Sequence, residues 1–228
     1  MRKATIIMTC VSLLLAVTWV AKADSLYLTA NFNNIYLTGS GLNNPVGGGS
    51  IAGSKLNGKL LPYDFCIGLY TDVYVPKTYD AFVTNNGTVN GGNVKINNAG
   101  EIAWLLTTYA SPQMTHDQQV AMQAAIWHIE YSTPGNIGLS TSAYGSDVLN
   151  YFKTYIGDVN NGVYKHNDFS LTGFDWITPY SYNECNHTYT YYQPQITATP
   201  EPSSLLLILS GLFSLYGLKI FRKKFQTA

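Results

Sequence analysis

The sequence predicts an α+β fold in which a β-rich, sandwich-like scaffold carries a helical insert. Apolar and polar residues alternate in the first part of the chain, as they do in half-buried strands. In the middle, apolar residues recur at helical spacing, and the alternation then returns. Abundant Tyr, Asn, Thr and Gly suit a β-rich exported domain with polar turns. The predicted order is therefore strands, helices and strands again.

The predicted strands start in residues 25–39, SLYLTANFNNIYLTG, and a loop rich in Gly and Asn follows them. The next strand contains FCIGLY, in which Phe65 and Ile67 share one face and Cys66 and Gly68 the other. Because Gly68 has no side chain, it leaves space for another group near Cys66. The later stretches FSLTGFDWITPYSY and HTYTYYQPQITAT are also predicted to be strands.

Three helices are predicted within the insert, from EIAWLLTTYA, THDQQVAMQAAIWHIEYST and SDVLNYFKTYIGDV. The second begins with Thr115 and Gln118 at the spacing of a capping box, in which each residue satisfies the other's backbone N–H group. Further along this helix, Gln123 falls at the edge of the apolar stripe, next to Trp127. A buried amide without a partner costs about 1–3 kcal/mol, so we expect Gln123 to be hydrogen-bonded.

The start of the chain is predicted to be a secretory signal peptide, residues 1–23. It combines Arg2 and Lys3 with an apolar run and an Ala-Lys-Ala cleavage site. Asp24 is then the first residue of the exported protein, and export by the secretory pathway follows.

The end of the chain is predicted to anchor it in a membrane. Residues 203–221 are almost free of charge and are about long enough to form a transmembrane helix. The tail that follows, residues 222–228, contains Arg222, Lys223 and Lys224. By the positive-inside rule, this basic tail stays in the cytoplasm and the main body lies outside.

Between these signals, residues 24–192 are predicted to form one domain and residues 193–202 a linker. Residues 24–199 hold six Lys, no Arg and twelve acidic residues, a formal charge of −6 that argues against a nucleic-acid partner. The sequence has no metal-ligand spacing and no recognisable pair of nucleophile and base. It therefore predicts no metal, no cofactor and no enzymatic activity.

Three short segments, FCIGLY, IAWLLTTY and MQAAIW, together resemble the thioester domains of bacterial surface adhesins. The resemblance implies an internal thioester between the sulfur of Cys66 and the side-chain carbonyl of Gln123, formed with loss of ammonia. It also implies that an amine-bearing surface or matrix molecule attacks this bond and is captured covalently, in a single turnover rather than by catalysis. The motif residues that support the pair are Phe65, Ile67, Ala125, Ile126 and Trp127.

The C-terminal segment resembles a PEP-CTERM sorting signal. It has Pro200, Glu201 and Pro202, then an apolar helix, then the basic tail. The resemblance implies recognition by an exosortase in the inner membrane of a Gram-negative bacterium and only transient anchoring there. The protein would then reach the cell surface or the extracellular matrix, where such proteins accompany exopolysaccharide and biofilm formation.

Two other interpretations remain open. In an oxidising compartment Cys66 and Cys185 would by default form a disulfide, which would leave a structural matrix protein without a thioester. Alternatively, Trp176 and the aromatic run Tyr189–Tyr192 would bind carbohydrate or matrix without a covalent bond.

Few side chains are predicted to assist chemistry at Gln123. His116 and His128 are the nearest histidines in the sequence, but His128 projects about 140° away from Gln123 around the helix. We expect His128, Asp64 and Glu130 to be solvated surface residues.

Overall fold

The structure is a computed structural model that describes residues 23–131, 137–161 and 169–199. The predicted transmembrane helix, the basic tail and the Pro-Glu-Pro motif lie outside the described residues, as does all of the predicted signal peptide except Ala23. Among the residues that are described, no helix is long and apolar enough to cross a membrane.

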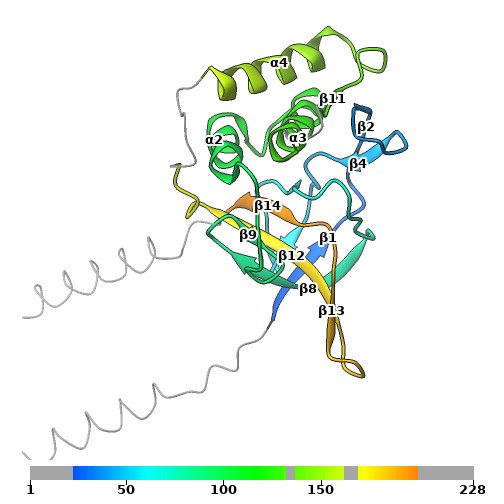
Figure 1. The fold of residues 1–228 in the computed structure, drawn as a ribbon, viewed down its shortest axis with the longest axis vertical. Helices are drawn as coiled ribbons and strands as arrows, with labels where there is room; N and C mark the ends of the chain where they lie inside the picture. The colour runs from blue at the N-terminus through cyan, green and yellow to red at the C-terminus, as the bar shows by residue number, and fades with distance from the viewer. Residues whose placement is uncertain (1–22, 132–136, 162–168, 200–228) are drawn as a thin grey trace, which may run out of the picture.

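The main sheet of the described chain has eight strands in the order β6-β5-β1-β8-β12-β14-β7, with β13 paired to β12 beside this path. All its pairs are antiparallel, and the sheet is strongly curled (Figure 1). Its strands are β1 (Asp24–Leu28), β5 (Lys55–Leu56), β6 (Lys59–Leu60), β7 (Phe65–Cys66), β8 (Lys77–Thr84), β12 (Phe174–Asn183), β13 (Thr188–Tyr191) and β14 (Gln195–Ala198).

The β-rich scaffold is confirmed, but its strands join one curled sheet, whereas a sandwich has two sheets face to face. The ten residues of β12 explain the difference. One edge of β12 pairs with β8, while the other edge pairs with β14 and then with β13. A single long strand thereby links segments that the sequence alone could equally assign to two sheets.

Three short ribbons complete the strands of the described residues. They pair β2 (Asn33–Ile35) with β4 (Val46–Gly48), β3 (Leu37–Thr38) with β11 (Gly138–Leu139), and β9 (Thr88–Val89) with β10 (Val94–Lys95). The β2–β4 ribbon lies near α3, so the Gly-rich segment predicted to be a loop includes a strand next to the helices (Figure 1).

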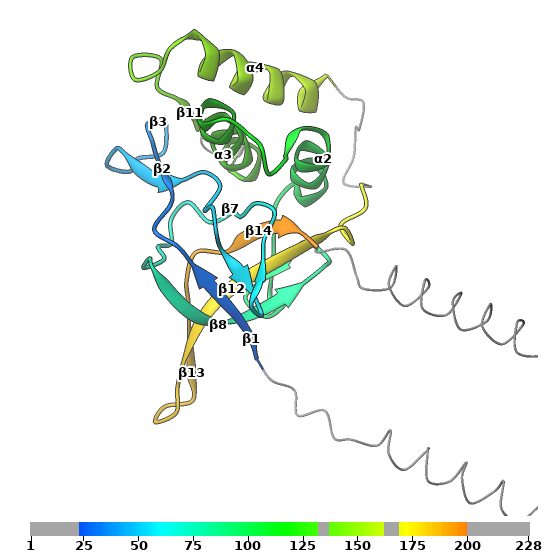
Figure 2. The ribbon, with the colours of Figure 1, turned by 180° about the vertical axis from the view of Figure 1, so that it is seen from behind.

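The helical insert is confirmed by α2 (Ala99–Tyr109), α3 (His116–Glu130) and α4 (Ser146–Asn160). These helices gather on one side of the sheet, and β7 and β14 lie on the side that faces them (Figures 1 and 2). α3 contacts both α2 and α4, and every residue from Val120 to Trp127 is buried. This helix is therefore covered on several sides rather than on one stripe.

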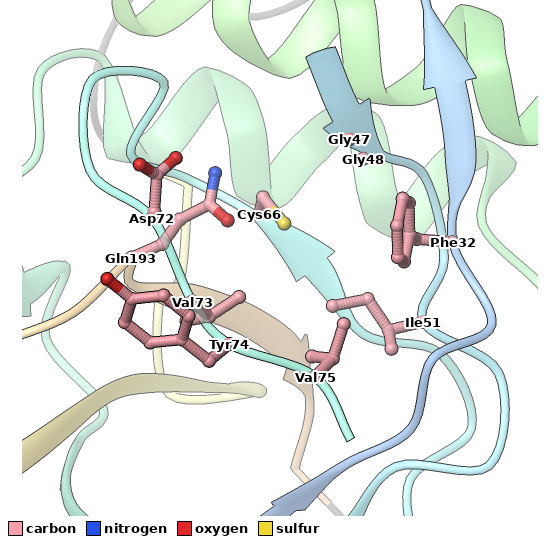
Figure 3. Close-up of a pocket in the computed structure, with 10 residues that line it drawn as sticks. All are labelled: Phe32, Gly47, Gly48, Ile51, Cys66, Asp72, Val73, Tyr74, Val75 and Gln193. Atoms are coloured by element: carbon pink, nitrogen blue, oxygen red, sulfur yellow. The ribbon is translucent and has the colours of Figure 1, made fainter. Parts of the chain in front are cut away.

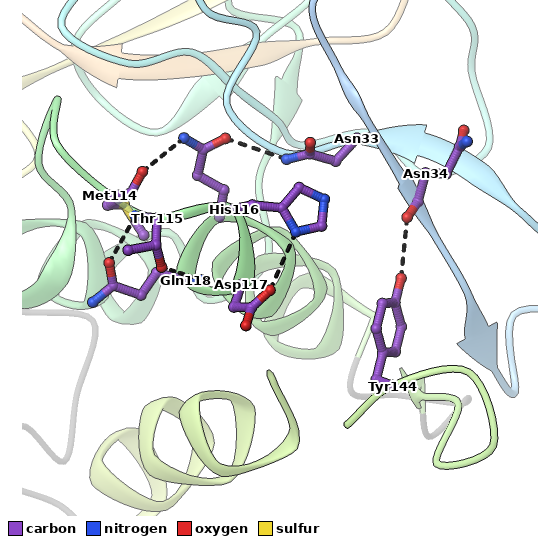
Figure 4. Close-up of polar contacts among 9 residues, drawn as sticks. Asn33, Asn34, Met114, Thr115, His116, Asp117, Gln118 and Tyr144 are labelled. Atoms are coloured by element: carbon purple, nitrogen blue, oxygen red, sulfur yellow. Dashed lines mark hydrogen bonds and ion pairs between the residues drawn. The ribbon is translucent and has the colours of Figure 1, made fainter. Parts of the chain in front are cut away.

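The start of α3 is fixed by the predicted capping box (Figure 4). The Thr115 side chain accepts a hydrogen bond from the Gln118 backbone N–H at 3.3 Å, and the Gln118 side chain accepts one from the Thr115 backbone N–H at 2.9 Å. Nearby, the Asn33 side-chain amide donates to Gln119 Oε1 at 3.2 Å. This bond ties the beginning of α3 to β2.

The prediction of a linker beginning at residue 193 was wrong. Residues 195–198 form β14, which pairs with both β12 and β7. Gln195, Ile196 and Thr197 are all fully buried. Inside the fold Thr197 Oγ1 donates to the Tyr63 carbonyl oxygen at 2.5 Å and Gln195 Nε2 donates to the Gln193 carbonyl oxygen at 3.0 Å, so these two groups do not need water.

Candidate functional site

Cys66 and Gln123, 57 residues apart in the sequence, meet in the buried space between β7 and α3. The backbone N–H of Cys66 donates to Gln123 Oε1 at 2.9 Å, and Gln123 Nε2 donates to the Cys66 carbonyl oxygen at 2.6 Å. Gln123 is fully buried, and Cys66 is only 2% exposed. The main chain of Cys66 thus binds both polar atoms of the amide, which brings the residue that carries the thiol next to Gln123.

A second backbone group binds the same amide oxygen. The N–H of Gly49 donates to Gln123 Oε1 at 3.2 Å. Two N–H groups thus converge on one carbonyl oxygen, an arrangement that stabilises negative charge developing there. Gly49 has a φ of +86°, which residues with a side chain rarely adopt, so this donor position requires glycine.

The neighbouring Gly48 allows the backbone of β4 to lie directly against the site. A Cβ atom at Gly48 would lie 2.6 Å from Trp127 Cη2 and 2.9 Å from Gln123 Cγ. Trp127 itself is fully buried. The close packing of β4, Trp127 and Gln123 therefore excludes water from the side of the amide that faces β4.

A pocket of about 310 Å³ reaches Cys66. Figure 3 shows the sulfur of Cys66 between Gln193 on one side and Phe32 and Ile51 on the other. The other residues that line the pocket are Gly47, Gly48, Asp72, Val73, Tyr74 and Val75. The pocket gives a small external molecule a route to the buried sulfur.

Asp64 lies two residues before Cys66, just before β7, and its carboxylate is close enough to the thiol to act on it electrostatically. Asp64 is fully buried, and neither of its carboxylate oxygens has a hydrogen-bond partner. Burial raises the pKa of Asp64 to about 7; the nearby Ser54 hydroxyl acts in the opposite direction, although it donates its own hydrogen bond to the Ile51 carbonyl oxygen at 2.8 Å.

The environment of Cys66 disfavours a thiolate. Burial raises the pKa of the Cys66 thiol, the nearby Asp64 carboxylate raises it further, and the Gln195 side chain lowers it. Gln195 is the direct partner of Cys66 in the β14–β7 ladder and is also fully buried. At neutral pH the thiol is therefore protonated, and its reaction requires a group that accepts the proton.

The expectation that Asp64, Glu130 and His128 lie at the surface was wrong. Glu130 is only 7% exposed, and burial raises its pKa to about 8. His128 is half-buried, and its Nδ1 atom lies within hydrogen-bond distance of the Ile137 carbonyl oxygen. The prediction assumed that one face of α3 meets solvent, whereas neighbouring segments cover the helix on several sides.

The other predicted motif residues are all buried and form the walls of the site. They are Phe65, Ile67, Ala125, Ile126 and Trp127. The Ile67 backbone N–H also donates to the Pro194 carbonyl oxygen at 2.7 Å, which extends the contact between β7 and β14. These residues hold the Cys66 strand and the Gln123 helix together.

The structure does not form the alternative disulfide. Cys66 and Cys185 are both free thiols, the first buried and the second exposed in the turn between β12 and β13. Trp176 is fully buried, so it is not available as an exposed binding residue. Tyr189 is 46% exposed and is the member of the predicted aromatic run that presents the most surface.

Sequence reasoning missed three parts of the site: the glycines of β4, Asp64 and Gln195. The run of Gly47, Gly48 and Gly49 was a usable signal, because consecutive glycines permit close backbone approach as well as loops. Asp64 and Gln195 gave no such signal, since only the fold buries them.

Within the described ranges, no group of three or more His, Cys, Asp or Glu side chains is placed to hold a metal ion. No known protein family matches this chain, and neither the curated proteins nor the solved structures include one with significant similarity to it.

Proposed function

We propose that this protein is an exported adhesin that captures amine-bearing partners covalently through an internal thioester between Cys66 and Gln123. The proposal rests on the two hydrogen bonds between the Cys66 main chain and the Gln123 amide, N–H to Oε1 at 2.9 Å and Nε2 to the carbonyl oxygen at 2.6 Å. A buried glutamine can find a partner in many ways. Here the amide oxygen and the amide nitrogen both bind the main chain of a residue whose side chain is a nucleophile.

The same arrangement supports the chemistry of thioester formation. The sulfur of Cys66 attacks the amide carbon of Gln123, and the negative charge that develops on Oε1 is stabilised by the N–H groups of Cys66 and Gly49. The C–N bond then breaks, and the amide nitrogen leaves as ammonia. Holding both groups in one place turns an improbable encounter into an effectively unimolecular step.

Capture of a partner reverses this reaction with a different nitrogen. An unprotonated primary amine enters the pocket beside Cys66 and attacks the thioester carbonyl. The C–S bond breaks, so that the products are an amide with the Gln123 side chain and a free Cys66 thiol. The buried Trp127 limits access of water to the bond and slows hydrolysis. Each molecule reacts once, which makes the protein a binder and not an enzyme.

The predicted signals at the two chain ends support a site of action outside the cell. The signal peptide directs export, and the Pro-Glu-Pro segment is sorted by an exosortase while the apolar helix rests in the inner membrane. The processed protein then acts at the cell surface or in the matrix of a Gram-negative bacterium. Its partners there are surface or matrix molecules that carry amines.

The test is the intact mass of the protein, purified without reductant, before and after treatment with methylamine. We expect a mass lower than the sequence mass by one ammonia, and then the addition of one methylamine with release of one thiol. Cys66→Ala and Gln123→Ala should abolish both effects, whereas Cys185→Ala should preserve them. A full-length mass that methylamine leaves unchanged would overturn the proposal.

One observation favours the non-covalent alternative. The hairpin of β12 and β13 carries aromatic rings in mutual contact, and the ring centres of Tyr189 and Tyr182 are 4.9 Å apart. Tyr189 is 46% exposed and Tyr182 is 42% exposed. Exposed tyrosines present an apolar face and a hydroxyl group, which suits a sugar ring. If this surface is the functional one, carbohydrate binding survives Cys66→Ala and is lost in Tyr189→Ala.

A further inference from the structure

We propose that Asp64 carries the proton between the attacking and the leaving group at the Cys66–Gln123 site. The inference rests on the thioester function proposed above and assigns it an acid–base residue. Asp64 lies two residues from Cys66, close enough for its charge to act on the thiol, and its two carboxylate oxygens have no hydrogen-bond partner. A fully buried carboxylate without a partner is costly, so its presence beside a reactive thiol calls for an explanation.

The surroundings of Asp64 leave it free to exchange a proton with the site. On β7 the titratable neighbour is Cys66 itself, and the loop before β5 contributes the Ser54 hydroxyl. The groups that contact Cys66 from the other elements, Gln195 of β14 and Gln123 of α3, are both uncharged amides. A carboxyl group whose pKa lies near 7 is divided between its acid and base forms at neutral pH, as an efficient proton carrier should be.

During thioester formation the Cys66 thiol gives up its proton as the S–C bond forms. The raised pKa of the thiol makes a free thiolate unfavourable, so proton loss and bond formation have to coincide. Asp64 in its ionised form accepts this proton and then donates it to the Gln123 nitrogen as the C–N bond breaks. The products are the thioester, one ammonia and ionised Asp64, so the residue is regenerated.

During capture the same residue works in the opposite sense. The attacking amine loses a proton to Asp64 as the N–C bond forms, and Asp64 passes the proton to the Cys66 sulfur as the C–S bond breaks. The two nearest histidines in the sequence are less suited to this role. His116 is exposed at the start of α3, where it contacts Asp117 at 3.2 Å, and His128 contacts the Ile137 carbonyl oxygen.

The experiment measures the rate of methylamine capture by the full protein between pH 5 and pH 9, corrected for the fraction of unprotonated amine. In the wild type we expect the rate to rise with pH through about 7 and to level off above it, as Asp64 ionises. Asp64→Asn should lower the plateau on the order of 10²-fold or more and remove the inflection. It should also lower the fraction of purified protein that has lost ammonia.

Two further variants separate proton transfer from a structural role. Glu130→Gln is the matched control, because Glu130 is also a buried acid with a raised pKa but is not part of this site, and it should leave the profile unchanged. Ser54→Ala removes the hydroxyl that favours ionised Asp64 and should move the inflection to higher pH. This variant keeps the test decisive if Asp64→Asn does not fold.

The outcomes distinguish this inference from the function on which it rests. If the wild type has not lost ammonia, the thioester proposal fails. If the wild type forms the thioester but Asp64→Asn has the same plateau and inflection, only the role of Asp64 is overturned. An inflection that Ser54→Ala does not move would also overturn it.

Discussion

The two cysteines of the described chain lie in opposite environments. Cys66 is buried at the junction of β7, β14 and α3, beside the buried polar side chains of Asp64 and Gln195. Cys185 is exposed in the turn of the β12–β13 hairpin, where the neighbouring side chains are solvated. The comparison teaches that a thiol next to an amide becomes a candidate for internal chemistry when the fold removes water and competing partners.

The largest expected difference between the two regions is in thiol reactivity. In the native protein iodoacetamide should modify Cys185 rapidly, whereas position 66 should react at least about 10³-fold more slowly, since its sulfur is either bonded in the thioester or held as a buried, protonated thiol. Peptide mass mapping over time measures both rates. Similar rates at the two positions would contradict the burial of Cys66.

The buried site should also make stability depend on pH. Burial raises the folded-state pKa of Asp64 to about 7 and of Glu130 to about 8, from ordinary values of 3.8 and 4.5. Both groups therefore stabilise the fold fully below about pH 4, and this stability is lost as pH rises to about 8. Each unit of pKa difference corresponds to about 1.4 kcal/mol.

Urea unfolding at pH 5 and pH 8 measures this effect, best in the Cys66→Ala background, where no thioester can form. We expect a higher free energy of unfolding at pH 5, and a smaller difference between the two pH values after Asp64→Asn is added. Equal stability at both pH values would show that water reaches these carboxyl groups.

A smaller effect is expected from adding one methyl group to β4. Gly48→Ala places a carbon 2.6 Å from Trp127 and 2.9 Å from Gln123, so it should lower the free energy of unfolding by about 1–3 kcal/mol and reduce thioester formation. Gly157→Ala in α4 is the matched control, because no atom lies within 4 Å of the added carbon. There the same change should stabilise the helix by up to about 1 kcal/mol.

The smallest effect is expected in the hairpin. Tyr189 contacts Phe82 at 5.5 Å and Tyr180 at 5.3 Å between ring centres, but it remains 46% exposed. Tyr189→Ala should therefore lower the free energy of unfolding by only about 1 kcal/mol and leave the methylamine reaction unchanged. Slower capture by this variant would indicate that the hairpin takes part in the reaction.

The local parts of the site could be predicted well from the sequence. Thr115 and Gln118 mark the start of α3, and the helical period turns Gln123 and Trp127 inward. Such features depend on residues three or four positions apart, so they are encoded within a short segment. The strand around Cys66 was predicted for the same reason, although β7 is only two residues long.

The single curled sheet, the position of β14 and the burial of Asp64 could not be predicted in this way. The stretch that contains β14 was predicted to have strand character but was also assigned to a linker from residue 193, and Asp64 was assigned to the surface as a charged residue. Both inferences follow the usual preference of polar groups for water. They fail here because a segment from the far end of the chain covers the Cys66 strand.

The sequence by itself determined the helices and the inward direction of Gln123, and the signals at its two ends remain a prediction of export. The tertiary structure alone decided that the main chain of Cys66 holds the Gln123 amide and that Gly49 supplies a second N–H group. The physical reason is distance along the chain. Gln123 is 57 positions from Cys66 and 74 positions from Gly49, so these residues meet only after the sheet and helices have packed. The cost of burying their polar groups is offset only by the partners that this packing supplies.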